Sequence, residues 1–488
     1  MACAHRPEGR DGPRDECGVF GIYAPGHEVS RLSYFALYAL QHRGQESAGI
    51  AAADVGGNII TRRELGLVNQ VFKETDLRTL AGELAIGHVR YSTTGSNAWE
   101  NSQPVHRSEG TNGSSRELAL AHNGNLINAV ALHSELSERG VSFSSTSDSE
   151  IVAALIATHP AERIEDAIAE ILPRLQGAFS IVAMTRDRVV AFRDPHGLRP
   201  LALGVLPGGD GGEPERHCVA SESCAFDIIG ARFLRDVEPG EVVTLSEQGI
   251  ESRRVLPDAR KAFCVFEYIY FARPDSRMNG QVLQVARARM GEILAREAPV
   301  EADLVIPVPD SGNAAARGYA RASGLPQDDG FVKNRYVART FIQPGQELRK
   351  HGLRLKFNPL PEVVAGKRLV VVDDSIVRGN TTRQIVQMLR DAGASEVHMR
   401  ISAPPIKHPC HYGIDMSTRE EMIAHERSVA EVAAELGCDS LAYISLAGVY
   451  EAVGGERASH CDACFTGEYP VKGSDGAQGK YALEPAPA

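Results

Sequence analysis

The run of residues 369–382, Leu-Val-Val-Val-Asp-Asp-Ser-Ile-Val-Arg-Gly-Asn-Thr-Thr, constrains the fold of this chain more than any other segment. Its continuously apolar start is typical of a strand buried in a parallel sheet. Asp373 and Asp374 close that strand, and a loop of small residues then leads into a helical stretch. Ligands bind at the carboxyl ends of such strands, where loop amides and a helix amino terminus favour phosphate. The run therefore predicts a phosphate site in an α/β domain.

The residue types of this run fit a phosphorylated sugar. Asp373 and Asp374 suit ribose hydroxyls and a cation, and residues 375–382 offer backbone amides and hydroxyls to a monophosphate. A purely structural interpretation also exists, with the acidic pair as a helix cap and Arg378-Gly379 as a turn. The sequence has no Gly-x-x-x-x-Gly-Lys-Ser/Thr loop, which argues against an ATP-cleaving P-loop.

The apolar pattern divides the 488 residues into two large parts. After residue 280, apolar strands alternate with helical stretches, which predicts a parallel sheet covered by helices on both faces. Between residues 17 and 255, short strand-like runs and helical stretches predict sheet layers covered by helices. Residues 1–16 have no periodic apolar pattern, and residues 471–488 are polar with Gly and Pro, which predicts a disordered tail.

Charge and hydropathy argue against several classes of function. The net charge of −11 at pH 7 opposes broad binding to nucleic acid or anionic membranes, which needs a basic face. No stretch approaches the ~18 uninterrupted apolar residues of a spanning helix, and residues 1–16 lack the apolar core of a signal peptide. We therefore expect a cytoplasmic protein with no nucleic-acid or membrane partner.

Cys17 begins a strand-like run directly after the polar leader. If cleavage freed its α-amine, that amine, with a pKa of ~7.7–8.0, would act as a general base beside its own thiol. Arg90 can pair with a substrate carboxylate, and Asp148 with its ammonium group. Asn123 and the amide of Gly124 can stabilise an oxyanion. Each residue also has a structural alternative. Cys17 would then be a buried cysteine in an edge strand, and Arg90 would be part of a surface ion pair. Asp148 would then be a helix cap, and Asn123-Gly124 a hairpin turn.

With these groups, residues 17–255 resemble the class II glutamine amidotransferases, which are N-terminal-nucleophile (Ntn) hydrolases. The resemblance implies a four-layer αββα sandwich in which Cys17 attacks the glutamine side-chain amide and releases ammonia. It also implies that residues 1–16 are a propeptide, removed at the Glu16-Cys17 junction. The implied glutamine-binding residues are Arg90, Thr93 and Asp148, and the implied oxyanion hole is Asn123 with Gly124.

The run at residues 369–382 resembles the 5-phosphoribosyl 1-pyrophosphate (PRPP) signature of type I phosphoribosyltransferases. This resemblance implies a phosphoribosyltransferase α/β parallel-sheet domain over residues 256–470, including a C-terminal cluster-binding segment. Asn380 stands where the family usually has Thr, which keeps a small polar residue. Mg²⁺ is implied at Ser311, Asp373 and Asp374. The implied PRPP-binding residues are Asp373, Asp374, Ser375, Arg378, Gly379, Asn380, Thr381, Thr382, Arg335 and Lys356. Arg335 and Lys356 lie in a basic segment, for which a solvated surface loop is the structural alternative.

Nine cysteines, an odd number scattered through a large chain, point to catalysis, metal binding or buried thiols instead of disulfides. Cys461 and Cys464 form a Cys-x-x-Cys pair, and Cys264 and Cys410 can complete a set of four thiolates. Four thiolates suit either zinc or a [4Fe–4S] cluster, and spacing alone does not decide between them. Cys3, Cys218, Cys224 and Cys438 are expected to be ordinary thiols.

Together the two halves resemble the glutamine PRPP amidotransferases, in the subclass with a propeptide and a [4Fe–4S] cluster. The resemblance implies glutamine-dependent conversion of PRPP to 5-phosphoribosylamine, with release of glutamate and pyrophosphate, the first committed step of de novo purine (IMP) biosynthesis. Ammonia made at Cys17 would be channelled to the PRPP site. The cluster ligands would be Cys264, Cys410, Cys461 and Cys464. A homotetramer and allosteric feedback inhibition by purine nucleotides are also implied.

Two other functions remain open at this point. One is another class II amidotransferase, such as the glucosamine-forming synthase, which pairs the same first half with sugar-isomerase domains. The other is a PRPP-responsive regulatory protein with an inactive glutaminase half, because type I phosphoribosyltransferase folds can serve as binding modules. The run with Asp373 and Asp374 argues against another class II amidotransferase. The negative net charge argues against the regulatory protein, which would need a basic surface.

Overall fold

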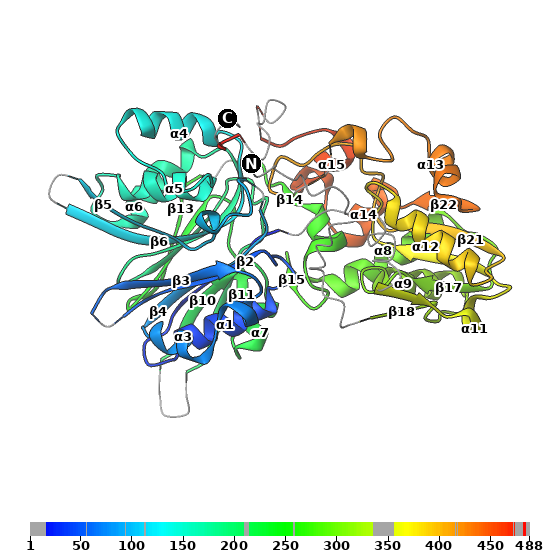
Figure 1. Ribbon diagram of the computed structural model, residues 1–488, viewed down its shortest axis with the longest axis horizontal. Helices are drawn as coiled ribbons and strands as arrows, with labels where there is room; N and C mark the ends of the chain where they lie inside the picture. Colours follow the sequence, from blue (N-terminus) through cyan, green and yellow to red (C-terminus); the bar gives the residue numbers. More distant parts are fainter. Residues whose placement is uncertain are drawn as a thin grey trace, which may run out of the picture.

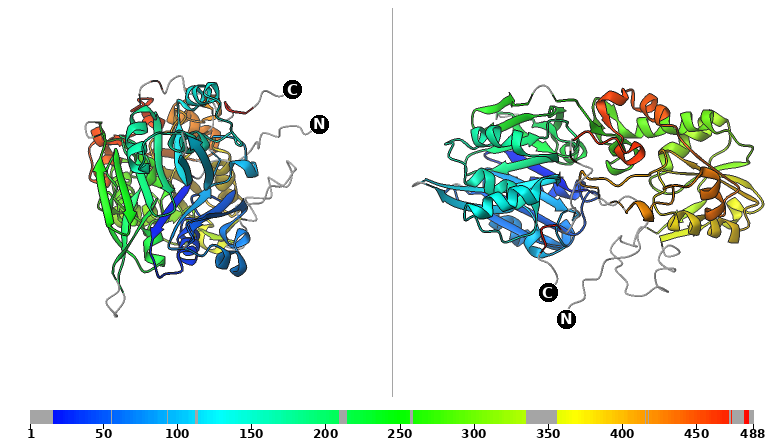
Figure 2. Two further views of the ribbon diagram at one scale, coloured as in Figure 1. Left: turned by 90° about the vertical axis from the view of Figure 1, so that its left-hand side faces the viewer. Right: turned by 90° about the horizontal axis from the view of Figure 1, so that it is seen from above.

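The computed structural model describes residues 16–471 apart from residue 55, residue 93, residues 112–113, 209–213, 257–258 and 335–355, residue 415 and residue 417, together with residue 473 and residues 482–484. Figure 1 shows two bodies side by side, with the blue-to-green first half on one side and the green-to-orange second half on the other. The views of Figure 2 show the same division. Among the described residues, no helix is long and apolar enough to cross a membrane.

Two antiparallel sheets stack face to face in the first half. The strand order of one is β11-β9-β10-β1-β4-β2-β3, and that of the other is β13-β12-β8-β7-β6-β5. The strands of the first sheet are β1 (Gly18–Tyr23), β2 (Ser47–Ala53), β3 (Ile59–Leu65), β4 (Leu84–Arg90), β9 (Ala202–Leu206), β10 (Arg216–Ala220) and β11 (Arg232–Asp236). Those of the second are β5 (Val105–Thr111), β6 (Ser114–Leu126), β7 (Gly177–Met184), β8 (Val189–Arg193), β12 (Glu241–Ser246) and β13 (Gly249–Arg254).

Helices cover the outer face of each sheet. Over the first sheet lie α1 (Val29–Ala39), α2 (Val68–Val71), α3 (Glu74–Thr79) and α7 (Cys224–Ile228). Over the second lie α4 (Ala129–Glu138), α5 (Asp148–Ala157) and α6 (Ile164–Ile171). Short helical turns are η1 (Trp99–Asn101) and η2 (Leu172–Arg174). A third apolar layer fills the space between the sheets, so the predicted αββα sandwich is present.

Close contact between the two sheets explains why β1 carries Gly21 at its centre. A Cβ atom at this position would lie 2.6 Å from Cγ1 of Val182 on the facing strand β7. Real Cβ atoms do not approach other atoms so closely, and overpacking a core of this kind destabilises it. The glycine therefore lets β1, which begins immediately after Cys17, pass close to the opposing sheet.

The second half is built on a parallel sheet of strand order β17-β20-β21-β22. Its strands are β17 (Leu304–Pro307), β20 (Arg368–Asp373), β21 (Glu396–Ile401) and β22 (Ser440–Tyr443). The helices are α8 (Leu283–Glu297), α9 (Asn313–Ser323), α11 (Pro361–Val364), α12 (Asn380–Asp391), α13 (Val429–Leu436), α14 (Leu446–Val453) and α15 (Ala463–Thr466). One continuous apolar core joins the sheet to these helices, as the alternating pattern predicts.

Small two-stranded pairs complete the second half. They are β14 (Phe263–Cys264) with β23 (His460–Cys461), β15 (Arg277–Met278) with β16 (Gln281–Val282), and β18 (Phe331–Lys333) with β19 (Phe357–Pro359). Short helical turns are η3 (Glu267–Phe271), η4 (Arg419–Glu421) and η5 (Arg457–Ser459). The parallel pair β14–β23 brings Cys264 opposite Cys461, so the start of the second half lies beside β23.

Candidate functional site

Cys17 lies at the entrance to β1, in the position that the sequence predicts for a nucleophile. Its side chain is buried, and its thiol donates to the carbonyl of Tyr91 at 3.2 Å. Burial raises the pKa of the thiol to about 11. In this chain Cys17 follows Glu16 through a peptide bond, so its nitrogen is an amide and offers no base.

Glu16 is buried in a network of charges that the sequence analysis did not foresee. Its carboxylate is 2.9 Å from Nη2 of Arg43 and also pairs with Arg199. Arg43 binds Glu267 at 2.7 Å and Glu222 at 2.6 Å, and its Nε donates to the carbonyl of Cys17 at 3.1 Å. Burial and the nearby Glu267 raise the pKa of Glu16 well above its usual value. The residue before Cys17 is therefore held as firmly as Cys17 itself.

The predicted oxyanion pair, Asn123 and Gly124, lies on β6. Nδ2 of Asn123 is buried, and none of the described residues accepts a hydrogen bond from it. A buried donor without an acceptor is costly, and such groups are typical of sites that receive a ligand. Gly124 has a φ of +146°, and a Cβ there would lie 2.0 Å from the carbonyl oxygen of Ala178. Only glycine fits this close approach to β7.

Arg90 and Asp148 lie near Cys17, because the charges of both influence the pKa of its thiol. Arg90 is buried at the end of β4 and donates to the carbonyls of Thr94 and Ser96 at 3.2 Å each. Asp148 is the first residue of α5 and accepts a hydrogen bond from the amide of Leu126 at 3.0 Å. The helix cap is Ser147, so Asp148 is not needed for capping. Thr93, the third predicted glutamine-binding residue, lies outside the described residues.

The acidic pair lies at the carboxyl end of β20, as predicted. Asp373 and Asp374 are each 6% exposed, and Oδ1 of Asp373 accepts from the amide of Asp374 at 2.9 Å. Burial and the charge of Asp374 raise the pKa of Asp373 well above its usual value. The hydroxyl of Ser311, from the loop after β17, is 3.5 Å from Oδ1 of Asp373. Two buried carboxyl groups this close, with a hydroxyl beside them, offer the oxygen ligands that Mg²⁺ prefers.

The loop after the acidic pair leads into α12 as the sequence predicts. Ser375 donates to Asp374 at 2.5 Å, and Nη2 of Arg378 is 2.9 Å from Glu421. Gly379 precedes α12 with a φ of +81°, and the first residues of that helix are Asn380, Thr381 and Thr382. Lys356 is close enough to Asp373 to lower its pKa. Arg335 lies outside the described residues.

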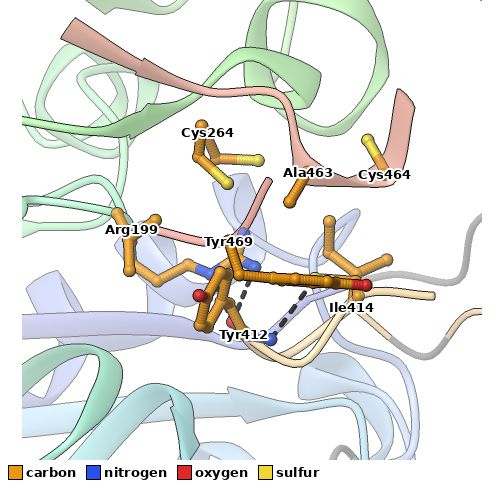
Figure 3. A pocket seen from close by; sticks show the side chains of 10 residues that line it. Arg199, Cys264, Tyr412, Ile414, Ala463, Cys464 and Tyr469 are labelled. Carbon is orange, nitrogen blue, oxygen red and sulfur yellow. Dashed lines mark hydrogen bonds between the residues drawn. The ribbon is translucent and has the colours of Figure 1, made fainter. Parts of the chain in front are cut away.

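The four predicted cluster ligands line one small pocket (Figure 3). Its walls also include Leu198, Arg199, Tyr412, Ile414, Ala463 and Tyr469, and its volume is about 10 Å³. In Figure 3, Cys264 and Cys464 face Tyr412 and Tyr469 across this space, with Arg199 at its edge. Among the described residues, no group of three or more His, Cys, Asp or Glu side chains is close enough together to hold a metal ion. The four predicted ligands therefore share one pocket without already forming a metal site.

A loop around residues 410–414 connects the thiol pocket to the first half. Nδ2 of Asn125 donates to the carbonyl of His411 at 3.0 Å, and Nε of Arg199 donates to the carbonyl of Tyr412 at 2.8 Å. Gly413, with a φ of +105°, packs so closely on Gly124 that a Cβ would lie 3.1 Å from its carbonyl carbon. The loop that carries Cys410 therefore touches the predicted oxyanion hole.

The sequence analysis did not find Arg43, Glu222 and Glu267. Arg43 lies in the motif Gln-His-Arg-Gly at residues 41–44, which could have drawn attention to it. Nothing in the sequence, however, relates Arg43 to Glu222 and Glu267, which lie far along the chain. Glu267 begins η3 in the second half, so its pairing with Arg43 joins the two halves.

Comparison with known proteins gives concordant results. Residues 88–227 match the glutamine amidotransferase domain family. The chain is 51% identical to the amidophosphoribosyltransferase of Synechocystis sp. over 94% of this chain and 92% of that protein. It is 48% identical to the amidophosphoribosyltransferase of Bacillus subtilis over 94% of this chain and 95% of that protein.

Two solved structures are similar over nearly their whole length. One is the glutamine PRPP amidotransferase from B. subtilis complexed with ADP and GMP, with a TM-score of 0.86 at 46% identity, covering 93% of this chain and 98% of that one. The other, the allosteric regulatory enzyme of purine biosynthesis, has a TM-score of 0.89 at 46% identity, covering 96% of this chain and 99% of that one.

The burial of Cys17 generates a prediction about the uncleaved chain. Because its thiol has a pKa of about 11, the reactive thiolate is a minor species near neutrality. We expect its alkylation by iodoacetamide, followed by mass spectrometry of the tryptic peptide, to accelerate about tenfold per pH unit between about pH 8 and 10. The Cys17→Ser chain serves as the control for peptide assignment. A rate that levels off already near pH 8 would contradict the prediction.

Proposed function

The chain belongs to the amidophosphoribosyltransferase family, and on that premise we propose that it transfers the amide nitrogen of L-glutamine to PRPP, giving 5-phosphoribosylamine, glutamate and pyrophosphate. The observation that carries the proposal is the presence of two sites in one chain. A buried cysteine with an unpaired amide donor nearby suits amide hydrolysis. An acidic pair before a phosphate-type loop suits a phosphorylated ribose. The comparisons favour this reaction, within purine biosynthesis, over the glucosamine-forming and regulatory alternatives.

In the first half-reaction, glutamine is hydrolysed at Cys17. Residues 1–16 act as a propeptide, and cleavage after Glu16 frees an α-amine with a pKa of ~7.7–8.0. That amine takes the thiol proton as sulfur attacks the side-chain amide carbon. Nδ2 of Asn123 and the amide of Gly124 stabilise the oxyanion, and the protonated α-amine returns its proton to the leaving nitrogen, which departs as ammonia. Water then hydrolyses the thioester to glutamate and the free thiol. Arg90 and Thr93 hold the carboxylate end of glutamine, and Asp148 holds its ammonium group.

In the second half-reaction, ammonia displaces pyrophosphate from the ribose carbon with inversion. The loop of Ser375, Arg378, Gly379, Asn380, Thr381 and Thr382 holds the 5-phosphate with backbone amides and hydroxyls. Asp373 and Asp374 accept hydrogen bonds from the ribose hydroxyls, while Arg335 and Lys356 pair with the pyrophosphate. Ser311, Asp373 and Asp374 fit Mg²⁺, since they offer oxygen ligands and a cation would offset the repulsion between the two adjacent carboxylates. The ion would neutralise charge on the leaving pyrophosphate.

Ammonia passes between the two sites inside the protein. In water at pH 7 ammonia is mostly protonated and loses its nucleophilicity, so a closed path preserves it. Contacts of His411 and Gly413 with Asn125 and Gly124 support such coupling, because they join the second half to the glutaminase site.

Cys264, Cys410, Cys461 and Cys464 hold a [4Fe–4S] cluster. All four line one pocket, which supports a shared four-thiolate site, and the resemblance to the cluster-containing subclass favours the [4Fe–4S] cluster over zinc. Neither half-reaction moves electrons, so the role of the cluster is to tie β14, the loop around 410–414 and α15 together.

We expect the oligomeric assembly and regulation of this chain to be those of the amidophosphoribosyltransferase family. The B. subtilis relative was solved with ADP and GMP, which supports purine nucleotides as feedback inhibitors of this chain. The PRPP pocket, which recognises a ribose phosphate, is one place where such nucleotides bind, and a neighbouring allosteric site is the other. The enzyme acts in the cytoplasm as a homotetramer.

Coupled product release tests the reaction as a whole. Purified protein is incubated anaerobically with glutamine, Mg²⁺ and PRPP, and glutamate and pyrophosphate are followed together. We expect equal and mutually dependent release, which Cys17→Ala abolishes. Glutamate without pyrophosphate would leave a glutaminase but overturn the PRPP assignment. Release of neither product from processed, cluster-loaded protein would instead favour a regulatory role.

Two variants separate the half-reactions. Asn123→Ala removes an oxyanion donor, so we expect glutamine-dependent turnover to fall about 10²–10³-fold while pyrophosphate release driven by added ammonia at alkaline pH is retained. Asp374→Asn tests the second half-reaction. This variant should lose PRPP-dependent turnover with both glutamine and added ammonia. Both rates are read from a pyrophosphate assay. Equal losses in the two assays for Asn123→Ala would contradict its assigned role.

The cluster proposal is tested by chemical analysis of iron and sulfide. Protein purified anaerobically should contain about four iron atoms per chain, and Cys264→Ser should lower that content substantially. Cys438→Ser is the matched control, because Cys438 lies outside the thiol pocket and should leave iron unchanged. About one zinc per chain, or equal effects of both substitutions, would overturn the assignment.

A further inference from the structure

A short segment from the end of the chain lies against the first half of the molecule. Residues 482–484 belong to the part that the sequence predicts as a disordered tail, yet Leu483 packs against the apolar core beneath α4 to α6. Oε1 of Glu484 accepts hydrogen bonds from the amide of Ser96 at 2.8 Å and from the hydroxyl of Thr146 at 2.7 Å. Figure 1 shows the segment as a short red stretch beside the first half.

The two donors that bind Glu484 are held in place by other contacts. The carbonyl of Ser96 accepts from Arg90 at 3.2 Å and from Nδ2 of Asn101 at 3.0 Å. The amide of Thr146 donates to Oδ1 of Asn101 at 2.9 Å. Ser96 and Thr146 are thus also held by contacts that do not involve Glu484, and we call the place formed by Ser96, Thr146 and Arg90 the carboxylate recess. Preorganised donors bind a carboxylate more strongly than mobile ones.

Charge also favours an ionised carboxylate in the recess. The hydrogen bonds from Thr146 and Ser96, together with the positive charge of Arg90, lower the pKa of Glu484. Burial lowers the pKa of Arg90, and the charges of Cys17, Asp148 and Glu484 in turn oppose that shift, so all three groups lie near its guanidinium. The tail therefore places a glutamyl carboxylate beside the residues assigned to the glutamine carboxylate and ammonium.

We propose that Glu484 competes intramolecularly with glutamine for the carboxylate recess formed by Ser96, Thr146 and Arg90. The inference rests on the proposed function, since it takes the recess as the place where the carboxylate of glutamine binds. Occupancy by Glu484 raises the glutamine concentration needed for half-maximal rate, because only the open fraction of molecules binds substrate. It leaves kcat unchanged, since bound glutamine excludes the tail. Release of the tail thus sets the sensitivity of the enzyme to glutamine.

Kinetics of Glu484→Ala test the proposal with a matched control. If the recess is open about one-fifth of the time, the substitution lowers KM for glutamine about fivefold at constant kcat. Ammonia-dependent pyrophosphate release, which bypasses the glutamine pocket, does not change. The control is Glu170→Gln on α6, an exposed glutamate of the same half that contacts His159, and it leaves KM unaltered.

A binding measurement decides the matter independently of catalysis. A fluorescent peptide with the sequence of residues 481–488, Tyr-Ala-Leu-Glu-Pro-Ala-Pro-Ala, is titrated into both chains. It should bind the Glu484→Ala chain about fivefold more tightly than the wild-type chain, because the recess of the variant is free. The same peptide with alanine in place of its glutamate should not bind.

The outcomes separate this proposal from the proposed function. Equal peptide affinity for both chains with unchanged KM overturns the competition. A higher KM with a lower kcat in Glu484→Ala also overturns it, because the tail would then support the pocket. If the chain hydrolyses no glutamine but the peptide still prefers Glu484→Ala, occupancy of the recess stands and the proposed function fails.

Discussion

Arg43 and Arg199 place two guanidinium groups in the centre of the molecule, each only 1% exposed. A buried charge is tolerated only when it is paired and fully hydrogen-bonded, and removal of one partner costs about 3–5 kcal/mol. The partners come from distant parts of the chain: Glu267 from η3, the carbonyl of Tyr412 from the loop before α13 and, in the uncleaved chain, Glu16 from the leader. The need to pair these two cations therefore fixes the two halves against each other and sets the entrance to β1 at the same time.

The two candidate sites differ in their charges. Around Cys17, the cation of Arg90 lies among the carboxylates of Glu46 and Asp148, and burial keeps the thiol protonated. At the end of β20 two carboxyl groups lie side by side, and burial together with their mutual repulsion makes Asp373 resist ionisation. At the first site several buried polar atoms, among them Nδ2 of Asn123 and Nε2 of His122, have no partner among the described residues. The second site suits a substrate that comes with Mg²⁺.

Local sequence predicted the elements whose signals are local. The apolar run before Asp373 and Asp374 predicted β20 and the acidic residues at its carboxyl end, and the start of β1 followed from the abrupt change of pattern at Cys17. The partners of Arg43 could not be found, because ion pairs between residues far apart leave no periodic trace. The position of Glu484 was missed for a related reason. Two hydrogen bonds to its side chain hold it, and a polar stretch with Gly and Pro carries no apolar pattern that would reveal them.

The pairing of β14 with β23 bears on the order in which the chain folds during synthesis. Every strand of the sandwich precedes Arg254, so the first half can assemble as soon as that part has left the ribosome. Cys264 pairs with Cys461 only after roughly 200 further residues have been synthesised, which takes about 10–40 s at about 5–20 residues per second. During that interval Arg43 and Arg199 lie beside an unfinished second half. The sandwich can therefore be folded before the second half supplies the remaining partners of Arg43 and Arg199.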